Sequence, residues 1–323
     1  MYLDFHGLKR EPFCLTPDPK FLHLAEPHRN ALVALLQGVI RRRGFMVATG
    51  AVGTGKTTIL NALLYLLGNL HKSGDRKLVS AFLVNPTLSR EEFLESLIDE
   101  FEVQATSNTK PRRLLALREL FLEAQRAGGT AVLIIDEAHL LTVELLEEIR
   151  LLTNMDTHRE KLLQVILCGQ PELASLLLLP QLRALRQRIA LLAQLRPLTL
   201  METAAYIEQR LRLAGLAEGS PFSPPVVEAI YHSTHGVPRL INLLCDSCMA
   251  VSFQVQRKEL DTDMVRRAAA GLTLGPVPSA GSANNATSAG GNGSSLGAPR
   301  SPLSPRAVFG EAAQERAAAG GKL

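Results

Sequence analysis

Short apolar runs alternate with longer segments of helical periodicity as far as residue 198. The short runs hold five to seven residues, a length typical of buried strands, whereas the longer segments place apolar residues three or four positions apart. We predict strands at residues 45–49, 78–84, 131–135, 162–168 and 189–195. Because strands that alternate with helices form parallel sheets covered on both faces, the pattern predicts an α/β fold.

Local signals mark the ends of several predicted helices. Ser89 is followed three residues later by Glu92, which predicts a capping box at the start of a helix. Gly128 should end a further helix that runs through Arg126. Residues 1–27 are expected to be loop-like, because their prolines prevent a long helix, and to pack on the core as an ordered strap.

Beyond residue 200 helical periodicity dominates, and the composition of the chain changes again in its last fifty or so residues. Helices are predicted at residues 203–214, 226–233, 239–251 and 261–270. The last fifty or so residues are rich in Gly, Ala, Ser and Pro and hold few bulky apolar side chains, which predicts disorder. We therefore expect a strap and sheet domain over 1–198, a small all-helical domain over 199–272 and a disordered tail over 273–323.

Composition narrows the class of protein. Apolar residues make up 46% of the chain, which suffices for a large core, but no run approaches the length of a membrane span. The first residues lack the pattern of a signal peptide, so we expect a cytoplasmic location. A net charge of +4 does not by itself indicate nucleic acid. The pair Cys245 and Cys248 lies in an apolar helical pattern, so ordinary helix packing is the expectation.

One segment carries the strongest chemical signal. It reads Gly50-Ala51-Val52-Gly53-Thr54-Gly55-Lys56-Thr57-Thr58, which matches the phosphate-binding loop pattern, here called the P-loop. A predicted strand precedes it and a predicted helix follows it, as the pattern requires. Glycines let backbone N–H groups surround phosphate oxygens, Lys56 would reach the β- and γ-phosphates of ATP, and the Thr57 hydroxyl would ligate Mg²⁺. The residues expected to contact the nucleotide are Gly50, Gly53, Thr54, Gly55, Lys56, Thr57 and Thr58.

Two acids follow the third predicted strand. Asp136 would hold Mg²⁺ at the tip of that strand, and Glu137 would polarise the attacking water. An acidic pair that merely ends a strand is the alternative. The letters Asp136-Glu137-Ala138-His139 also occur in one class of RNA helicases, but too little chain follows for the second nucleotide-fold domain which that class needs.

Three more polar residues are candidates for the same reaction. Gln170 follows the fourth strand, where it could touch both the γ-phosphate and the attacking water, although it could also be a turn residue. Arg188 precedes the last strand, where it could meet the γ-phosphate of a neighbouring subunit; the alternative is a solvated basic helix. Arg239 follows Pro238 at a helix start and would contact the nucleotide from the second domain, unless it is a surface arginine.

Taken together these residues resemble those of the AAA+ ATPases, and more narrowly the group of ExeA, or general secretion pathway protein A. The stretches that carry the resemblance are 5–8, 12–13, 17–21, 146–154, 167–173, 185–189 and 238–242. The resemblance spans about residues 1–270. It implies a P-loop domain with a helical lid that hydrolyses ATP with Mg²⁺ as a homo-oligomer, such as a hexamer-type ring or a filament.

The resemblance also implies a setting. Such ATPases work from the cytoplasm, peripheral to the inner membrane, with a membrane or secretion-complex protein, and the best-known ones support assembly of the type II secretin. The chain departs from full-length members in showing no transmembrane helix and no peptidoglycan-binding domain, and in having His139 where Gln is usual. Two other functions stay open, a DNA-binding regulator of the transposition type and a nucleotide switch that scarcely hydrolyses.

Overall fold

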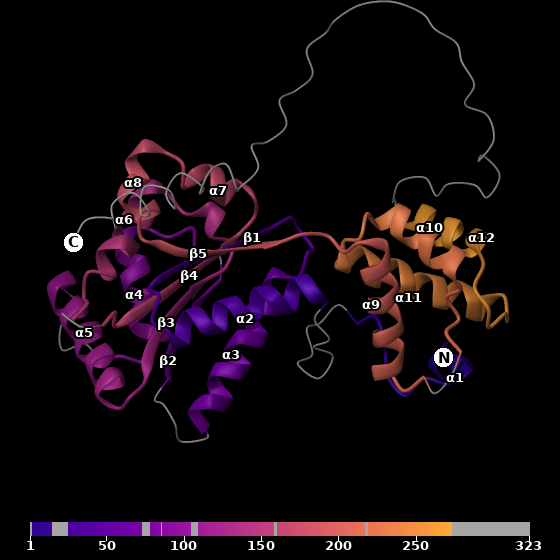
Figure 1. Ribbon diagram of the computed structural model, residues 1–323, viewed down its shortest axis with the longest axis horizontal. Coiled ribbons are helices and arrows are strands. Elements are labelled where there is room, and N and C mark those ends of the chain that lie inside the picture. Colours follow the sequence, from indigo (N-terminus) through magenta and orange to yellow (C-terminus); the bar gives the residue numbers. More distant parts are fainter. Residues whose placement is uncertain are drawn as a thin grey trace, which may run out of the picture.

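The computed structural model describes residues 2–14, 25–72, 78–84, 86–104, 109–157, 160–216 and 219–272, and every structural statement below refers to these residues. They form a part built on a sheet and a part built of helices (Figure 1). The predicted tail over 273–323 lies outside the described residues. Among the described helices, none combines the length and the apolar character needed to cross a membrane.

Five parallel strands form the sheet, in the order β2-β3-β4-β1-β5. They are β1 (Phe45–Gly50), β2 (Leu78–Leu83), β3 (Thr130–Ile135), β4 (Leu163–Gly169) and β5 (Ile189–Leu195). All five predicted strands are thus confirmed to within one residue at each end. The central strands β1 and β4 are buried along their whole length, as expected for a sheet covered on both faces.

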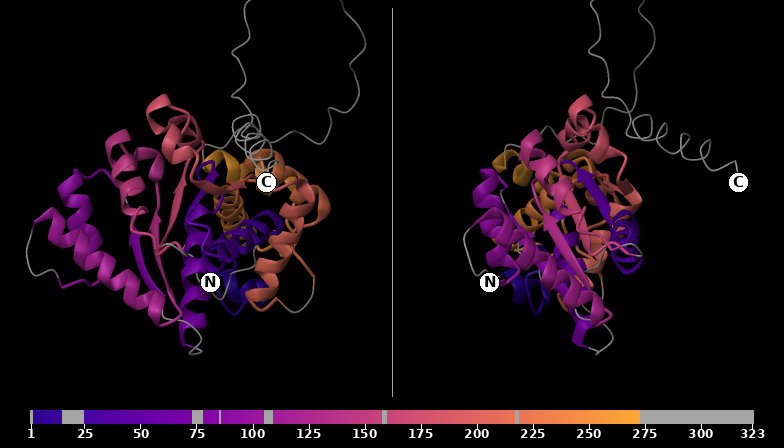
Figure 2. Two further views of the ribbon diagram at one scale, coloured as in Figure 1. Left: turned by 60° about the vertical axis from the view of Figure 1, so that its left-hand side comes forward. Right: turned by 90° about the vertical axis from the view of Figure 1, so that its left-hand side faces the viewer.

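Helices cover both faces of this sheet (Figure 2). Successive side chains of β1 alternate between two apolar clusters: Phe45 and Val47 belong to one, Met46 and Ala48 to the other. The first cluster includes residues of α4 (Arg90–Glu100), α5 (Lys110–Arg126) and α6 (Val143–Leu152), and the second residues of α2 (Glu26–Ile40) and α3 (Lys56–Lys72). Short elements complete this part: η2 (Ala138–Leu140), α7 (Glu172–Leu176), η3 (Pro180–Leu182) and α8 (Arg183–Arg186).

The helical part has an apolar core of its own. It consists of α9 (Leu200–Leu213), α10 (Pro224–Thr234), α11 (Pro238–Gln254) and α12 (Thr262–Gly271), so the four predicted helices are confirmed. Cys245 and Cys248 are buried in this core as free thiols, and burial raises the pKa of Cys248 to about 12. A thiol of that pKa is not reactive at neutral pH, which agrees with a packing role.

The start of the chain differs from its prediction. Residues Tyr2–His6 form a short helix, α1, where a loop was expected. The Tyr2 hydroxyl donates to the Asp246 carboxylate on α11, and the Phe5 ring meets that of Phe253 edge to face. Tertiary contacts therefore hold a helix that is too short to form on its own. Leu8 and Phe13 also pack in the helical core, so this segment lies with the helices rather than with the sheet (Figure 1); the predicted domain limits stay a prediction.

The register of the sheet places three chain segments at one edge. Thr49 at the end of β1 pairs with Gly169 at the end of β4, and Ile135 at the end of β3 pairs with Leu167. Because all strands are parallel, the loops that follow β1, β3 and β4 leave the sheet side by side. This edge therefore brings together the P-loop, the Asp136–Glu137 pair and Gln170.

Candidate active site

The P-loop joins β1 to α3 and depends on its glycines. Gly53 and Gly55 have φ values of +78° and +92°, in the left-handed region that glycine tolerates best. A Cβ on Gly50 would lie 2.7 Å from Oγ1 of Thr54 and 2.8 Å from Cβ of Leu195. A side chain at these positions would therefore strain the backbone or crowd the cradle.

Lys56 begins α3 and folds back over the loop. Its Nζ donates to the carbonyl oxygens of Gly50, at 2.9 Å, and of Ala51, at 3.1 Å, and the side chain is buried. The Thr54 hydroxyl also donates to the Ala51 carbonyl, at 2.7 Å. The loop is thus held by its own side chains, with an ammonium group at its centre. Such a set of donors fits a polyphosphate.

Thr57 and Asp136 lie in direct contact. The Thr57 hydroxyl donates to Oδ2 of Asp136 at 2.7 Å, and the backbone N–H of Glu137 donates to Oδ1 at 2.9 Å. A hydroxyl and a buried carboxylate, side by side behind a phosphate cradle, are the oxygen donors that Mg²⁺ prefers. No cluster of three or more His, Cys, Asp or Glu side chains suited to a metal occurs among the described residues. The site thus fits Mg²⁺ held by one or two side chains together with phosphate oxygens, rather than a cage of protein ligands.

Glu137, His139 and Gln170 form a row beside this pair. Glu137 has a left-handed backbone, with φ +51°, and its Oε2 is buried without a hydrogen bond. Nδ1 of His139 lies 3.3 Å from that oxygen, and Nε2 of His139 lies 3.1 Å from the amide nitrogen of Gln170. The imidazole therefore links the two predicted catalytic residues. Sequence reasoning missed this role of His139, although its spacing from Glu137 was visible.

Arg239 approaches the P-loop from the helical part. Its backbone N–H donates to the Gly53 carbonyl at 3.2 Å. A Cβ on Gly53 would lie 3.0 Å from both Cβ of Arg239 and Cγ1 of Val237. The first turn of α11 thus rests on the loop, and Gly53 makes that close approach feasible.

Arg188 lies away from the other candidates. It precedes β5, so it stands at the edge of the sheet where strands begin, opposite the P-loop. Its Nη1 donates to Oγ1 of Thr153 at 2.8 Å and to the Arg150 carbonyl at 3.4 Å. Within one copy of the chain, Arg188 therefore does not belong to the site that contains Lys56.

His28 contacts the P-loop and was not among the residues predicted from the sequence. Nε2 of His28, on α2, lies 2.6 Å from the Thr54 carbonyl oxygen, and the ring is buried. Since a carbonyl oxygen accepts, Nε2 carries the proton. Burial lowers the pKa of His28, more than its hydrogen bond to Thr54 raises it. No sequence signal marked this contact, because the partners lie 26 residues apart.

Comparison with known proteins identifies a domain family and similar folds. A family profile described as AAA domain matches residues 40–177. The fold is similar to that of the Aeropyrum pernix ORC2 protein, with a TM-score of 0.60 and 18% identity over 81% of this chain and 71% of that one. It is also similar to Cdc6p of Pyrobaculum aerophilum, with a TM-score of 0.57 and 17% identity over 80% of this chain and 69% of that one. At such identities the likeness shows the fold alone. The chain thus contains an AAA domain, with a parallel sheet and a helical C-terminal part.

A nearer relative exists in sequence. The chain is 39% identical over 254 residues to General secretion pathway protein A of Aeromonas hydrophila. The match covers 78% of this chain and 45% of the relative, so the chain spans about half the length of that protein. The chain therefore carries an AAA domain and is related to General secretion pathway protein A, and the predicted resemblance is confirmed.

Proposed function

We propose that this chain is an oligomeric AAA+ ATPase that hydrolyses ATP with Mg²⁺ and passes the resulting motion to an envelope export complex. The single observation that carries the proposal is the 2.7 Å hydrogen bond between Thr57 and Asp136, directly behind the glycine cradle. A glycine-rich turn without a ligand would not require a buried carboxylate at that place. An acid that merely ended its strand would not require the hydroxyl.

Binding would exchange internal contacts for contacts to the nucleotide. Lys56 bonds two neutral carbonyls of the loop, and phosphate oxygens would compete for its ammonium group because charge-assisted hydrogen bonds are stronger. The Arg239 side chain is exposed at the start of α11, beside the loop, and would add a cation from the helical part. Gly50, Gly53, Thr54, Gly55 and Thr58 would supply backbone or hydroxyl donors in this scheme.

Hydrolysis would use the row of Glu137, His139 and Gln170. The Oε2 atom of Glu137 lies 3.3 Å from Nδ1 of His139 but forms no hydrogen bond with a described residue, so the carboxylate could accept one from the attacking water. The Gln170 amide carries two N–H donors and can reach both His139 and a γ-phosphate oxygen. Mg²⁺, when bound by Thr57 and Asp136, would neutralise charge on the phosphates.

Assembly would complete the site. Because Arg188 stands at the opposite edge of the sheet, it cannot reach a nucleotide in the P-loop of its own copy, but it could meet one in the P-loop of a second copy. A head-to-tail contact, in which the strand-start edge of one copy meets the P-loop edge of the next, would supply it. Such contacts close into rings or continue as filaments.

The partner and place of action are inferred from the relative. Its name assigns it to general secretion, and the match covers 78% of this chain. We infer that this chain acts at the cytoplasmic side of the inner membrane on a membrane or secretion-complex protein. Pull-down from detergent-solubilised membranes with the Glu137→Gln chain and ATP should retain that partner, and the Lys56→Ala chain should not.

Two substitutions test the ATPase itself. Lys56→Ala should abolish ATP binding in calorimetry, whereas Glu137→Gln should bind ATP and lose roughly 10²–10⁴-fold in turnover. Arg112→Ala and Glu123→Gln, two exposed positions on α5, are the matched controls and should change neither. If both site variants kept normal turnover, the proposal would be wrong.

Mixing two inactive variants tests whether Arg188 of one copy acts on the nucleotide of another. Turnover per chain should rise with protein concentration, and Arg188→Ala should remove that rise. Mixing Arg188→Ala with Lys56→Ala should restore part of the activity, because copies with the second change still offer Arg188 to intact P-loops. No recovery in the mixture, with both variants folded and assembled, would contradict a role in trans.

A further inference from the structure

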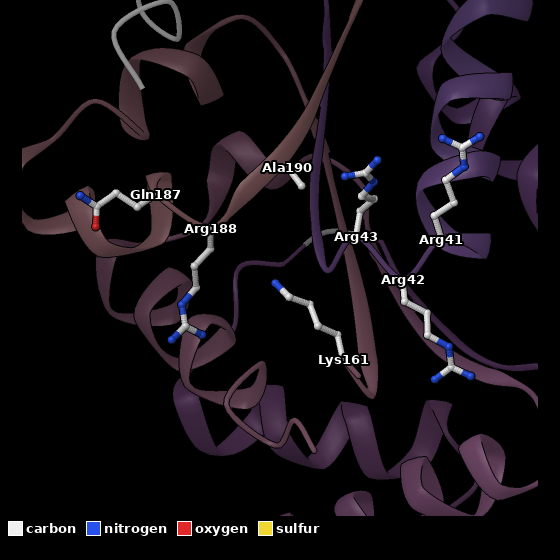
Figure 3. Close-up of a pocket in the computed structure, with 7 residues that line it drawn as sticks. All are labelled: Arg41, Arg42, Arg43, Lys161, Gln187, Arg188 and Ala190. Atoms are coloured by element: carbon white, nitrogen blue, oxygen red, sulfur yellow. The ribbon is translucent and has the colours of Figure 1, made fainter. Parts of the chain in front are cut away.

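A cavity of about 470 Å³ lies at the edge of the sheet opposite the P-loop. We call it the basic cavity. It is lined by Arg41, Arg42, Arg43, Lys161, Gln187, Arg188 and Ala190 (Figure 3). Five of these seven residues are cations and none is an acid, so the cavity is built for a negative ligand.

The topology explains why cations from distant parts of the chain meet here. Arg43 lies just before β1, Lys161 just before β4 and Arg188 directly before β5. These strands are parallel neighbours in the order β4-β1-β5, so the residues that precede them share one edge. Three segments, rather than one basic stretch, thus contribute to the same hollow.

Local contacts hold several of these side chains in place. Gly44 has φ +85°, and a Cβ there would lie 2.6 Å from both Cδ and Nζ of Lys161. The lysine side chain therefore packs directly against the backbone of Gly44. The guanidinium of Arg188 is fixed by Thr153. Arg42 pairs with Glu160 at 3.1 Å and points away from Arg41 and Arg43 (Figure 3). The cavity is therefore partly preorganised.

Four of the five cations in the cavity form no ion pair with another described residue. Within the described part of the chain, no carboxylate lies at salt-bridge distance from Arg41, Arg43, Lys161 or Arg188. Asp156 lies within electrostatic reach of Lys161 and Arg188, and Glu147 within reach of Arg188, without an ion pair between them. Cations without paired acids repel one another, and an anion with several charges would relieve that repulsion.

We propose that the basic cavity binds the polyphosphate group of a nucleotide, either free in solution or held in the P-loop of a second copy. The volume suits a ligand of that size. Guanidinium groups match phosphate oxygens with paired hydrogen bonds, and four arginines line the cavity together with Lys161. Binding to the nucleotide of a second copy rests on the proposed function, because that copy must carry a nucleotide in its P-loop. Binding of a free nucleotide does not depend on the proposed function.

Calorimetry with inorganic tripolyphosphate tests the free ligand. The Lys56→Ala chain is titrated, since its own P-loop no longer competes. One site should remain, and Arg43→Ala or Lys161→Ala added to this chain should each weaken it about tenfold, the value of one charge-assisted hydrogen bond. Arg112→Ala, an exposed arginine outside the cavity, should leave the affinity unchanged. Circular dichroism confirms that each variant is folded.

Sedimentation velocity tests the second copy as the source. The Glu137→Gln chain with ATP should assemble, and Arg43→Ala or Lys161→Ala should shift it to monomers while fluorescent-nucleotide binding at the P-loop stays normal. Loss of tripolyphosphate binding alone assigns the cavity to a free ligand, and loss of assembly alone assigns it to the neighbour's nucleotide. If the cavity variants lose neither tripolyphosphate binding nor assembly, the proposal is wrong. It is also wrong if a duplex oligonucleotide binds in a way that depends on these cations while tripolyphosphate fails to bind. Failure of the ATPase proposal is recognised separately, by unchanged turnover of the Lys56→Ala chain.

Discussion

Nε2 of His139 lies 3.1 Å from the amide nitrogen of Gln170, and the opposite ring nitrogen faces Glu137. An amide nitrogen donates, so Nε2 accepts and the ring proton resides on Nδ1, 3.3 Å from the Glu137 carboxylate. The Gln170 backbone N–H lies 3.5 Å from Nδ1, which in this tautomer carries the proton and does not accept from it. The imidazole thus orients one predicted catalytic residue according to the position of the other.

Removing this link should slow turnover without weakening ATP binding. We expect His139→Ala to lower kcat by about one to two orders of magnitude, as loss of a positioning group for a general base would. Gln170→Ala should have a similar effect, and the double variant should be scarcely worse than either single one, because both changes break the same path. Steady-state kinetics measures this.

The conservative variant separates positioning from mere packing. His139→Gln keeps an acceptor and a donor at about the same reach, so it should recover most of the activity. Additive losses in the double variant, or normal kcat in His139→Ala, would show that His139 does not connect the two residues.

The contact between Thr57 and Asp136 predicts a defined magnesium requirement. Thr57→Val keeps the shape of the side chain and removes its hydroxyl. The Mg²⁺ concentration for half-maximal turnover should then rise roughly 10–100-fold, as for other groups that tune a metal site. Thr57→Ser retains the hydroxyl and should stay near the wild type. The test is a Mg²⁺ titration at saturating ATP; equal requirements for all three chains would remove Thr57 from the metal site.

Elements with strong local signals were predictable from the sequence. The strand at residues 189–195 was predicted with the limits that it has, and the capping box of Ser89 and Glu92 forms as expected. Pro238 begins α11, in agreement with its preference for the first turn. These features depend on residues a few positions apart, which is the range over which propensity and periodicity act.

Features that depend on distant partners were not predictable in the same way. Helix α1 exists because Tyr2 meets Asp246, 244 positions away. His28 and His139 gained roles from the Thr54 carbonyl and the Gln170 amide, which only the fold brings near. The strand order decides such contacts, and one sequence does not reveal it.

Where the sheet joins the helical part, a substitution at Gly236 should strongly destabilise the fold. Gly236 has φ +72°, and a Cβ there would lie 1.9 Å from the Leu198 carbonyl oxygen, while its own carbonyl accepts from the Leu198 N–H at 2.8 Å. Gly236→Ala should therefore lower the free energy of unfolding by about 3 kcal/mol or more, from backbone strain together with the clash.

Gly219 provides the matched control for this change. It has nearly the same φ, +73°, and among the described residues no atom would lie within 4 Å of a Cβ at this position. Gly219→Ala should cost about 1–2 kcal/mol, from the left-handed backbone alone. Urea denaturation of both variants measures the two costs. If they were equal, close packing at Gly236 would contribute nothing.

Glu202 at the start of α9 predicts a pH-dependent contribution to stability. The Arg196 guanidinium, bound to both carboxylate oxygens at 2.7 and 2.8 Å, lowers the pKa of Glu202 to about 2, and Thr199 at the N-cap adds to the effect. Because the pKa is lowered on folding, the charge stabilises the folded state above pH 4.5. That contribution is lost as the pH falls from there toward about 2.

Glu202→Gln isolates this charge, because glutamine can still complete the capping box with Thr199. Half of the Arg196 side chain is exposed, so solvent screening limits the expected loss at pH 7 to about 1 kcal/mol. The difference from the wild type should shrink between pH 4.5 and 2 and should also decrease in high salt. Glu208→Gln, which breaks a pair with both partners more than half exposed, should change stability little at any pH. Urea denaturation across this range would refute the assignment if the Glu202→Gln deficit persisted unchanged at pH 2.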